Sequence, residues 1–471
     1  MDDFFLQKVL GLEKEKTSLP DREFRCQNTL PSQTDYDVQF GMFVPREFSP
    51  CGNYLVSLSV DTSSVLISRL APTAQNPRDM FCDVGVVSIG TEEQKIAKEV
   101  CLFPLNTETV LVAVEGETKK QRRTSQYTAS VTLRHTDTRF FLIDLKTATV
   151  SSSIEFFCDC FKLAKGGTVC VLDDTVAIHS LAYQETKIYS LRRKTFEQIG
   201  AIGPVCHLGD TLQEVSPEQI VGFKHKLLVF LFRKNTEQAP NRETLKYFYS
   251  QFNTICEMLV WKVYLVDGCH VVLQLGSRNF YTLDASRLET VLLVTYNFVS
   301  AEILEIHTSH DEDLLEEIVG LRRSHTTEKR LLVDSKERSA KPTAATCYHE
   351  RGRLERRVAH LAQRHTRSAV LLSMALSRLF KNHPAAVSPY VDAFTTTARL
   401  SSTLRQCREK RTVFQCRRTG KVAFTLPLTT PDSPEHGTRH AAHIFHPCLP
   451  LAITVLYTQA TSFCINIHRT P

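Results

Sequence analysis

The chain has 471 residues, of which 42% are hydrophobic and 23% are charged, so it can bury a substantial core. Its net charge of +6 at pH 7 is small for this length and is not in itself a sign of a nucleic-acid-binding protein. It has no secretory signal, no run of about 20 apolar residues that would cross a membrane, and 15 scattered cysteines, which together predict an intracellular protein with reduced thiols.

The first predicted element is a short helix over residues 1–15, with Phe5, Val9 and Leu12 at helical spacing; together with Phe4 these are the candidate partner-binding residues. An isolated helix of this length is only marginally stable in water, so either its own domain or a partner should cover its apolar side. A frayed terminus is the alternative. A polar, proline-containing segment follows, and we treat residues 1–39 as an N-terminal docking segment.

Residues 46–70 predict an antiparallel meander. Pro50 and Gly52 lie in a predicted turn, and the residues from Tyr54 onward alternate between two faces, as in a strand that is covered on both sides. A second turn begins at Asp61, and a further apolar run begins at Val65. Turn, strand, turn and strand in so short a stretch are typical of part of a propeller blade.

The same unit, an apolar strand followed by a polar turn and another strand, recurs at residues 140–150, 187–199, 294–304 and 413–424. Single strands are predicted at residues 226–232, 260–266 and 271–275, and a last strand at 462–468 is expected to close a ring against N-terminal strands. The spacing is irregular. We therefore predict a mainly β fold, a degenerate β-propeller with helical insertions, built from residues 40–308 and 385–471.

Two shorter segments interrupt this pattern. A basic loop carries Lys119, Lys120, Arg122 and Arg123 and is either a solvated loop or a patch for nuclear import or phosphate binding. Residues 245–259 predict a helix packed on the ring, because their apolar side chains recur at helical spacing, namely those of Phe248, Phe252, Ile255 and Leu259.

The largest interruption is a helical, basic insertion over residues 309–384. Within it, residues 350–381 predict a long helix in which eight Arg or Lys and two Glu give a net charge of +6, and its basic residues include Arg353, Arg356, Arg357 and Arg364. Such a helix can contact an acidic partner, nucleic acid or a membrane surface, or it can simply lie on the propeller.

No nucleotide-binding or hydrolase motif accompanies this fold. His436, His440, His443 and His446 follow Glu435 and could share zinc on a helix. However, residues 438–444 predict a strand that leads into a turn at 445–447, where these ligands would not converge. Cys158 and Cys160 are predicted to lie on one face of a strand, which favours burial over redox chemistry. We therefore predict no catalytic residue, no cofactor site and no metal site.

The chain resembles the De-etiolated-1 family, the light-signalling repressors of plants and their relatives in other eukaryotes. The ordered motifs that carry the resemblance are Arg46-x-Phe-Ser-Pro-x-Gly-x-Tyr54 with Asp61, Ile143-Asp-Leu145, Lys224-His-x-Leu-Leu-Val229, Trp261-Lys262, Tyr296-Asn-x-Val299, Asp313-Leu-Leu315, Ser388-Pro-Tyr-x-Asp392 and Phe445-His-Pro447. The first 40 residues and residues 320–385 depart from the family pattern.

This resemblance implies a WD-repeat-like β-propeller that is not an enzyme and acts in the nucleus, in transcription regulation. It implies a role in a cullin-4 ubiquitin ligase. The implied partners are the damage-specific DNA-binding protein 1 adaptor, a small De-etiolated-associated subunit, a ubiquitin-conjugating enzyme or its inactive relative and, in some members, histone tails. No membrane and no small-molecule substrate is expected. The alternative is a chromatin or nucleic-acid binding propeller independent of a ligase.

Overall fold

The computed structural model describes the strands, the connections between most of them and two helices. The described residues are 33–38, 40–49, 51–71, 79–102, 108–116, 135–163, 168–203, 222–237, 242–276, 292–308, 390–392, 399–403, 411–416, 422–427, 440–446, 451–457 and 463–469. None of the helices in this part of the chain is long and apolar enough to cross a membrane.

Four consecutive four-stranded sheets, which we call blades 1 to 4, form the first part of the fold. Blade 1 contains β2 (Phe43–Phe48), β3 (Tyr54–Ser59), β4 (Ser64–Leu70) and β5 (Phe81–Ser88). Blade 2 contains β6 (Gln94–Leu102), β7 (Thr109–Gly116), β8 (Thr136–Asp144) and β9 (Thr149–Asp159). Blade 3 contains β10 (Val169–Leu172), β11 (Thr175–Ser180), β12 (Glu185–Ser190) and β13 (Glu197–Ile202). Blade 4 contains β14 (Leu259–Leu265), β15 (His270–Gly276), β16 (Leu292–Asn297) and β17 (Glu302–Thr308).

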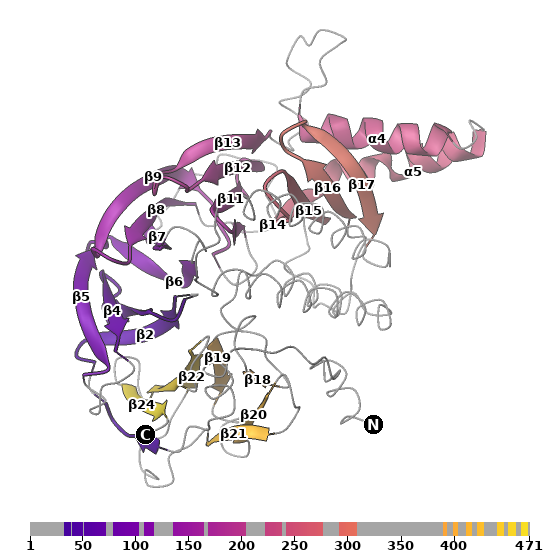
Figure 1. The fold of residues 1–471 in the computed structure, drawn as a ribbon. Helices are drawn as coiled ribbons and strands as arrows, with labels where there is room; N and C mark the ends of the chain where they lie inside the picture. The colour runs from indigo at the N-terminus through magenta and orange to yellow at the C-terminus, as the bar shows by residue number, and fades with distance from the viewer. Residues whose placement is uncertain are drawn as a thin grey trace, which may run out of the picture.

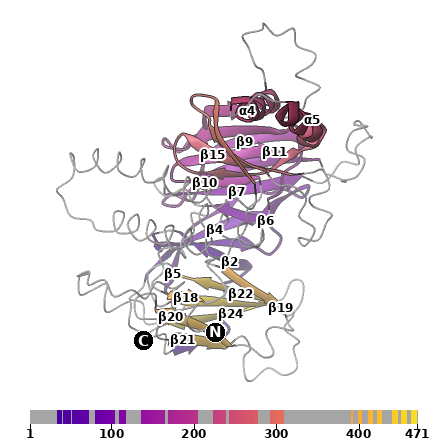
Figure 2. The same ribbon diagram turned by 90° about the vertical axis from the view of Figure 1, so that its right-hand side faces the viewer.

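Two further sheets come from the C-terminal part of the chain. Blade 5 contains β18 (Tyr390–Asp392), β20 (Arg411–Cys416) and β21 (Val422–Pro427). Blade 6 has the order β1 (Gln33–Asp35), β24 (Phe463–Arg469), β23 (Ala452–Tyr457), β22 (His440–Phe445) and β19 (Arg399–Thr403). Blades 1 to 4 follow one another along an arc, and blade 6 continues that arc beyond β2 (Figures 1 and 2). The predicted mainly β, WD-repeat-like propeller fold with helical insertions is therefore confirmed.

The N-terminal and C-terminal strands share one sheet. β1 pairs with β24 in antiparallel register, with Thr34 opposite His468. The His468 ring is buried and lies within hydrogen-bond distance of the Thr34 hydroxyl, at 3.0 Å, and of the Thr454 hydroxyl, at 2.9 Å. One side chain thus connects β1, β24 and β23. The predicted pairing of the last strand with an N-terminal strand is confirmed, and it joins the segment immediately before blade 1 to the end of the chain.

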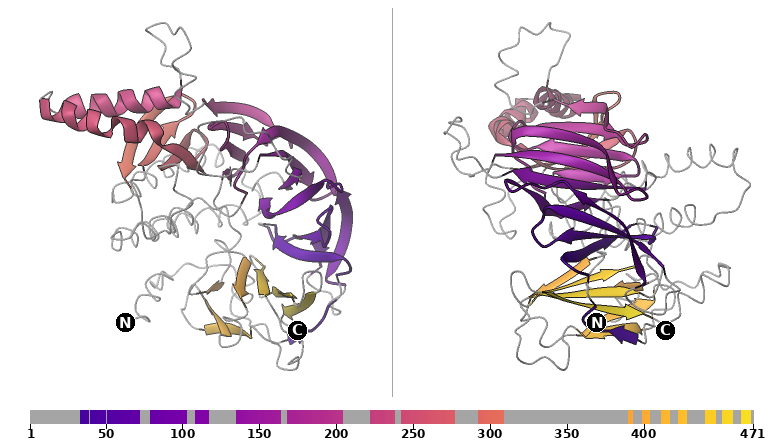
Figure 3. Two further views of the ribbon diagram at one scale, coloured as in Figure 1. Left: turned by 180° about the vertical axis from the view of Figure 1, so that it is seen from behind. Right: turned by 90° about the vertical axis from the view of Figure 1, so that its left-hand side faces the viewer.

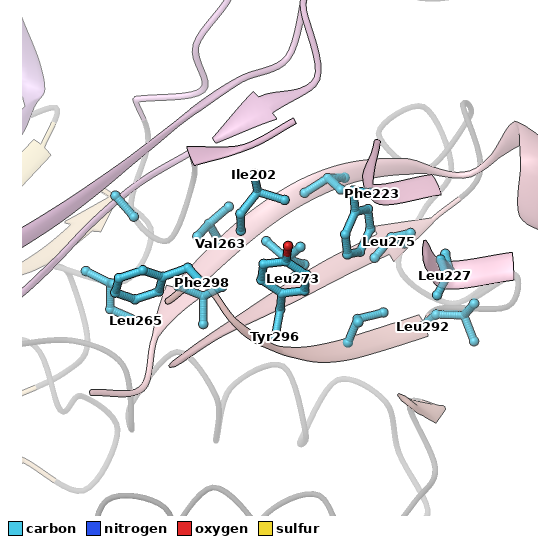
Figure 4. Close-up of a cluster of buried hydrophobic side chains, with 14 of the residues drawn as sticks. Ile202, Phe223, Leu227, Val263, Leu265, Leu273, Leu275, Leu292, Tyr296 and Phe298 are labelled. Atoms are coloured by element: carbon cyan, nitrogen blue, oxygen red, sulfur yellow. The ribbon is translucent and has the colours of Figure 1, made fainter. Parts of the chain in front are cut away.

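Apolar side chains fill the seams between neighbouring blades, because each sheet has two apolar faces to bury. Val56 and Ile67 of blade 1 pack with Val112 of blade 2 in one cluster. Corresponding clusters join blade 2 to blade 3 and blade 6 to blade 1. The seam between blades 3 and 4 also includes Phe223 and Leu227 from a helix (Figure 4). The core therefore lies between the blades.

The turns between the third and fourth strands of blades 2, 3 and 4 share local features. In blade 2 the Asp144 carboxylate accepts a hydrogen bond from the Lys146 backbone N–H, and in blade 4 the Asn297 side-chain oxygen accepts bonds from the N–H groups of Val299 and Ser300. Each turn has a non-glycine residue at positive φ, namely Ala148, Lys194 and Ala301 in blades 2, 3 and 4. These bonds explain why Asp144 and Asn297 belong to the motifs of the resemblance.

Two helices, α4 (Phe223–Glu237) and α5 (Arg242–Glu257), lie between blades 3 and 4 in the sequence. They form a helical hairpin that projects beyond β16 and β17 (Figures 1 and 3). The predicted helix at residues 245–259 is confirmed apart from its bounds. The predicted strand at residues 226–232 is wrong, because this segment belongs to α4. Its apolar residues run without a break, so neither the period of a strand nor that of a helix is visible there.

Glycine at position 200 allows blade 4 to approach the outer strand of blade 3. A Cβ atom at Gly200 would lie 2.9 Å from Cδ2 of the buried Phe298 ring, whereas a Cβ atom at Gly203 would meet nothing within 4 Å. We expect Gly200→Ala to destabilise the protein by about 1–3 kcal/mol through overpacking, and Gly203→Ala to have almost no effect. Thermal unfolding of both variants measures this, and equal effects would contradict the tight seam.

Candidate interaction surfaces

The surface residues that the sequence singled out lie outside the described part of the chain. These are the N-terminal residues Phe4, Phe5, Val9 and Leu12, and the basic residues Lys119, Lys120, Arg122, Arg123, Arg353, Arg356, Arg357 and Arg364. Adaptor docking through the former and a basic patch formed by the latter stay predictions.

His446 belongs to the seam between blades 6 and 1. Its Nε2 atom donates to the Gly52 carbonyl at 3.0 Å, and its ring packs edge-on against Phe48 with centroids 5.0 Å apart. Two motifs of the resemblance, Phe445-His-Pro447 and the turn after Phe48, therefore meet here. The predicted strand before His446 is confirmed as β22. The described residues contain no group of three side chains that could hold a metal ion.

The two neighbouring cysteines differ in their surroundings. Cys160 is buried, and burial raises the pKa of its thiol to about 12, so the thiol is protonated and unreactive at neutral pH. The prediction that both thiols lie on one face of a strand is not met, because β9 ends at Asp159 and Cys158 has a φ of 51° that interrupts the alternation.

A buried polar network joins blades 3 and 4. His179 is fully buried, with Nδ1 2.9 Å from the Thr186 hydroxyl and Nε2 2.9 Å from the Val260 carbonyl oxygen. The Gln184 side-chain oxygen accepts a hydrogen bond from the Val260 N–H at 2.8 Å. Both backbone polar groups of Val260 are therefore bonded to side chains of blade 3. Each of these contacts crosses a seam or braces a turn, which is a structural role. Sequence reasoning missed this network because its partners are far apart in the chain.

Stability should decrease as the pH falls from about 6.5 to about 4. Burial lowers the pKa of His179, His446 and His468 to about 4, whereas a histidine in the unfolded chain titrates near ~6.5. Between these two pKa values the unfolded chain binds more protons than the folded protein. Each histidine therefore lowers the free energy of unfolding by about 2 kcal/mol at pH 5 relative to pH 7.5.

Thermal unfolding at pH 7.5 and pH 5 measures this decrease. The His446→Gln variant keeps an N–H donor and does not titrate, so it should lose less stability than the natural chain between the two pH values. An equal loss would show that His446 does not contribute.

The hairpin of α4 and α5 is anchored at its base. The Lys224 side chain is 1% exposed, and its Nζ atom donates to the carbonyl oxygens of Ile255 at 2.8 Å, Cys256 at 3.2 Å and Met258 at 2.6 Å. This ammonium group caps the C-terminal end of α5, where the unpaired carbonyls and the helix dipole favour a cation. Because Lys224 itself lies in the first turn of α4, it ties the two helices together.

Further contacts hold α4 on blade 4. The Phe223 ring packs edge-on against Tyr296, with centroids 5.7 Å apart, and both lie in the cluster shown in Figure 4. On the outer side, Lys234 forms an ion pair with Glu305 of β17. The base of the hairpin is thus fixed relative to the blades, while the opposite end, where α4 leads to α5, projects outward (Figure 1).

The hairpin exposes aromatic side chains. Tyr249 of α5 is 64% exposed, and Phe232 of α4 is 39% exposed. Aromatic and arginine side chains are enriched where proteins bind one another, so the hairpin is the best candidate interaction surface among the described residues.

Solved structures similar to this chain include two propellers. The β-propeller domain of Cps50 (Swd1) from Myceliophteria thermophila is 9% identical over 93% of this chain and 99% of that one, with a TM-score of 0.34. The WD40 domain of coronin from Toxoplasma gondii is 7% identical over 91% of this chain and 70% of that one, with a TM-score of 0.27.

Curated relatives match almost the whole length. The light-mediated development protein DET1 of Arabidopsis thaliana is 23% identical over 525 aligned positions, which cover 94% of each chain. The protein of the same name from Solanum lycopersicum is also 23% identical, over 94% of this chain and 93% of the relative. A family model described as De-etiolated protein 1 Det1 matches residues 98–470. The chain therefore belongs to the De-etiolated protein 1 family.

Proposed function

We propose that this chain is a non-catalytic scaffold of a cullin-4 type ubiquitin ligase that promotes or regulates the ubiquitination of nuclear regulators and chromatin proteins. The observation that carries this proposal is the family match over residues 98–470. The two relatives are named for light-mediated development, and we extend regulation of that kind, in the nucleus, to this chain.

The chemistry of the described residues supports a binding role. His179, His446 and Cys160 are buried in the seams, and burial shifts the pKa of each group away from the charged form. Exposed aromatic side chains instead lie on the projecting hairpin. A rigid ring that holds a ubiquitin-conjugating enzyme and a target together would act by raising their effective concentration, which requires no reaction centre.

The partners in this proposal are the damage-specific DNA-binding protein 1 adaptor, a small De-etiolated-associated subunit, and a ubiquitin-conjugating enzyme or its inactive relative. Histone tails are proposed as a further ligand. A chromatin or nucleic-acid binding propeller without a ligase is the second candidate, and the net charge of +6 over residues 350–381 favours it.

Co-purification with the cullin-4 adaptor at moderate salt tests the proposal, using the full chain and a variant that lacks residues 1–19. We expect the full chain to bind and the truncated chain not to bind, which would identify the N-terminal segment as the contact. Binding by both chains would keep the ligase role and assign the contact to the propeller. Binding by neither would overturn the proposal and favour the second candidate.

A further inference from the structure

A basic and aromatic stripe runs along the projecting hairpin. It consists of Phe232 and Arg233 on α4, and Arg242, Lys246 and Tyr249 on α5, and all five side chains are exposed. We call this set the hairpin stripe. The two helices that carry it project beyond β16 and β17 (Figures 1 and 3).

The three α5 residues share one side of the helix. Arg242, Lys246 and Tyr249 have the spacing i, i+4 and i+7, so they lie in a row over two turns, or about 10 Å. Tyr247 lies on the other side of α5, about 160° around the helix from Tyr249, and Glu243 lies between the two sides, about 60° from Lys246. Arg242 and Lys246 are therefore aligned with Tyr249, and Glu243 lies beside this row and not in it.

The aromatic part of the stripe continues across to α4. Phe248 packs edge-on against Phe232, with centroids 5.4 Å apart, and against Tyr249, at 5.5 Å. It also contacts Phe252, at 6.0 Å. Phe248 itself is buried, so it supports the two exposed rings from below. The aromatic part of the stripe thus extends across both helices.

The cations of the stripe have no ion-pair partner among the described residues. The ion pair of the hairpin with the blades uses Lys234, which lies next to Arg233. Arg242 and Lys246 lie in one row with Tyr249 on α5, and Arg233 follows Phe232 on α4. This composition matches a ligand with carboxylates beside an apolar stripe. An amphipathic helix can carry carboxylates beside an apolar stripe, and its side chains repeat with the same period as those of α5. Such a helix, packed along α4 and α5, would cover the rings of Phe232 and Tyr249.

We propose that the hairpin stripe is a docking site for an acidic amphipathic helix of another protein. Its apolar residues would cover Phe232 and Tyr249, and its carboxylates would pair with Arg233, Arg242 and Lys246. This inference goes beyond the ligase role and does not depend on it. A single-stranded nucleic acid fits less well, because the edge-on packing of Phe232 against Phe248, at an angle of 77°, leaves that ring only 39% exposed for stacking.

The test measures binding of the full chain to a labelled peptide by fluorescence anisotropy. The peptide is about 20 residues long and has leucine and phenylalanine at i, i+3, i+4 and i+7 with glutamate and aspartate beside them. A second peptide has the same apolar residues with lysine in place of the acids. Single-stranded DNA is the third probe. Circular dichroism and thermal unfolding confirm that each variant is folded.

Two variants change the stripe and one provides a matched control. Tyr249→Ala removes an exposed ring from the stripe, and the double change Arg242→Glu with Lys246→Glu reverses its charge. Tyr247→Ala removes a ring of similar exposure, 62% compared with 64% for Tyr249, from the other side of α5. We expect saturable binding of the acidic peptide, weakened at least about tenfold by each stripe variant and less than about twofold by Tyr247→Ala.

Several results would overturn the proposal. These are no saturable binding of the acidic peptide, equal binding of the lysine peptide, and equal losses with Tyr247→Ala and Tyr249→Ala. Preferential binding of single-stranded DNA that depends on the stripe would also overturn it, since the surface would then bind nucleic acid. None of these results bears on adaptor co-purification, so the two proposals fail separately.

Discussion

Replacing Lys224 by methionine should destabilise the hairpin of α4 and α5 by about 3 kcal/mol or more. The ammonium group donates to three carbonyl oxygens at the end of α5, and Lys224 is 1% exposed. Methionine fills a similar volume but donates nothing, so buried carbonyls lose a charged donor. Hydrogen bonds to charged groups contribute about 1.5–3 kcal/mol each, and buried acceptors without donors add a desolvation cost.

Lys226→Met is the matched control for this prediction. Lys226 is two residues further along α4, and its Nζ atom donates to the Ala301 carbonyl at an exposed position. Its replacement should cost less than about 1 kcal/mol. Thermal unfolding gives the stability of both variants, and amide hydrogen exchange shows whether α5 loses protection. Equal effects, or unchanged exchange in α5 of Lys224→Met, would contradict the capping role.

Phe48→Ala should destabilise the protein by about 3–5 kcal/mol, the usual cost of deleting a fully buried aromatic ring. Phe48 is 0% exposed and lies in the seam between blades 6 and 1. Its ring centroid lies 5.0 Å from that of His446 and 6.4 Å from that of Phe81. The substitution leaves a cavity at the place where the last blade meets the first, so we expect the pairing of β1 with β24 to lose protection as well.

Phe157→Ala is the control for the seam, because this phenylalanine is 66% exposed on β9. The free energy of unfolding of the Phe157→Ala protein should differ from that of the natural chain by no more than about 0.5 kcal/mol. Urea unfolding and hydrogen exchange of β1 and β24 test both variants. If the Phe48→Ala protein were as stable as the Phe157→Ala protein, this seam would not be what holds blades 6 and 1 together.

The hairpins of the blades could be predicted because their pattern is local. Residues 140–150 and 294–304 each have apolar strand residues on both sides of a turn that starts with Asp144 or Asn297, and they lie in β8–β9 and β16–β17. The segment 226–232 could not be predicted in this way. Its unbroken apolar run fits a buried strand or a buried helix. The bond of Lys224 to the Ile255 carbonyl, 31 residues later, ties this segment to α5 as a helix, and the local pattern does not indicate that bond.

The candidate surfaces were harder to predict than the fold. The contact of His446 with Gly52 joins residues 394 positions apart, and no pattern within either segment indicates the other. The apolar face of α5 was predicted from its spacing. The hairpin stripe was not, because it combines α5 with Phe232 and Arg233 of a segment whose helical form the sequence did not reveal. The adaptor-binding and basic residues singled out from the sequence stay predictions.

The ligase role is tested most directly by comparing two ligands of the full chain at two salt concentrations. Binding to the purified cullin-4 adaptor and to bare duplex DNA is measured at about 0.1 M and about 0.5 M salt, because phosphate contacts lose affinity steeply over this range. We predict saturable adaptor binding at both concentrations and weak DNA binding that disappears at the higher one. No adaptor binding at either concentration, together with strong DNA binding at low salt, would contradict the scaffold role.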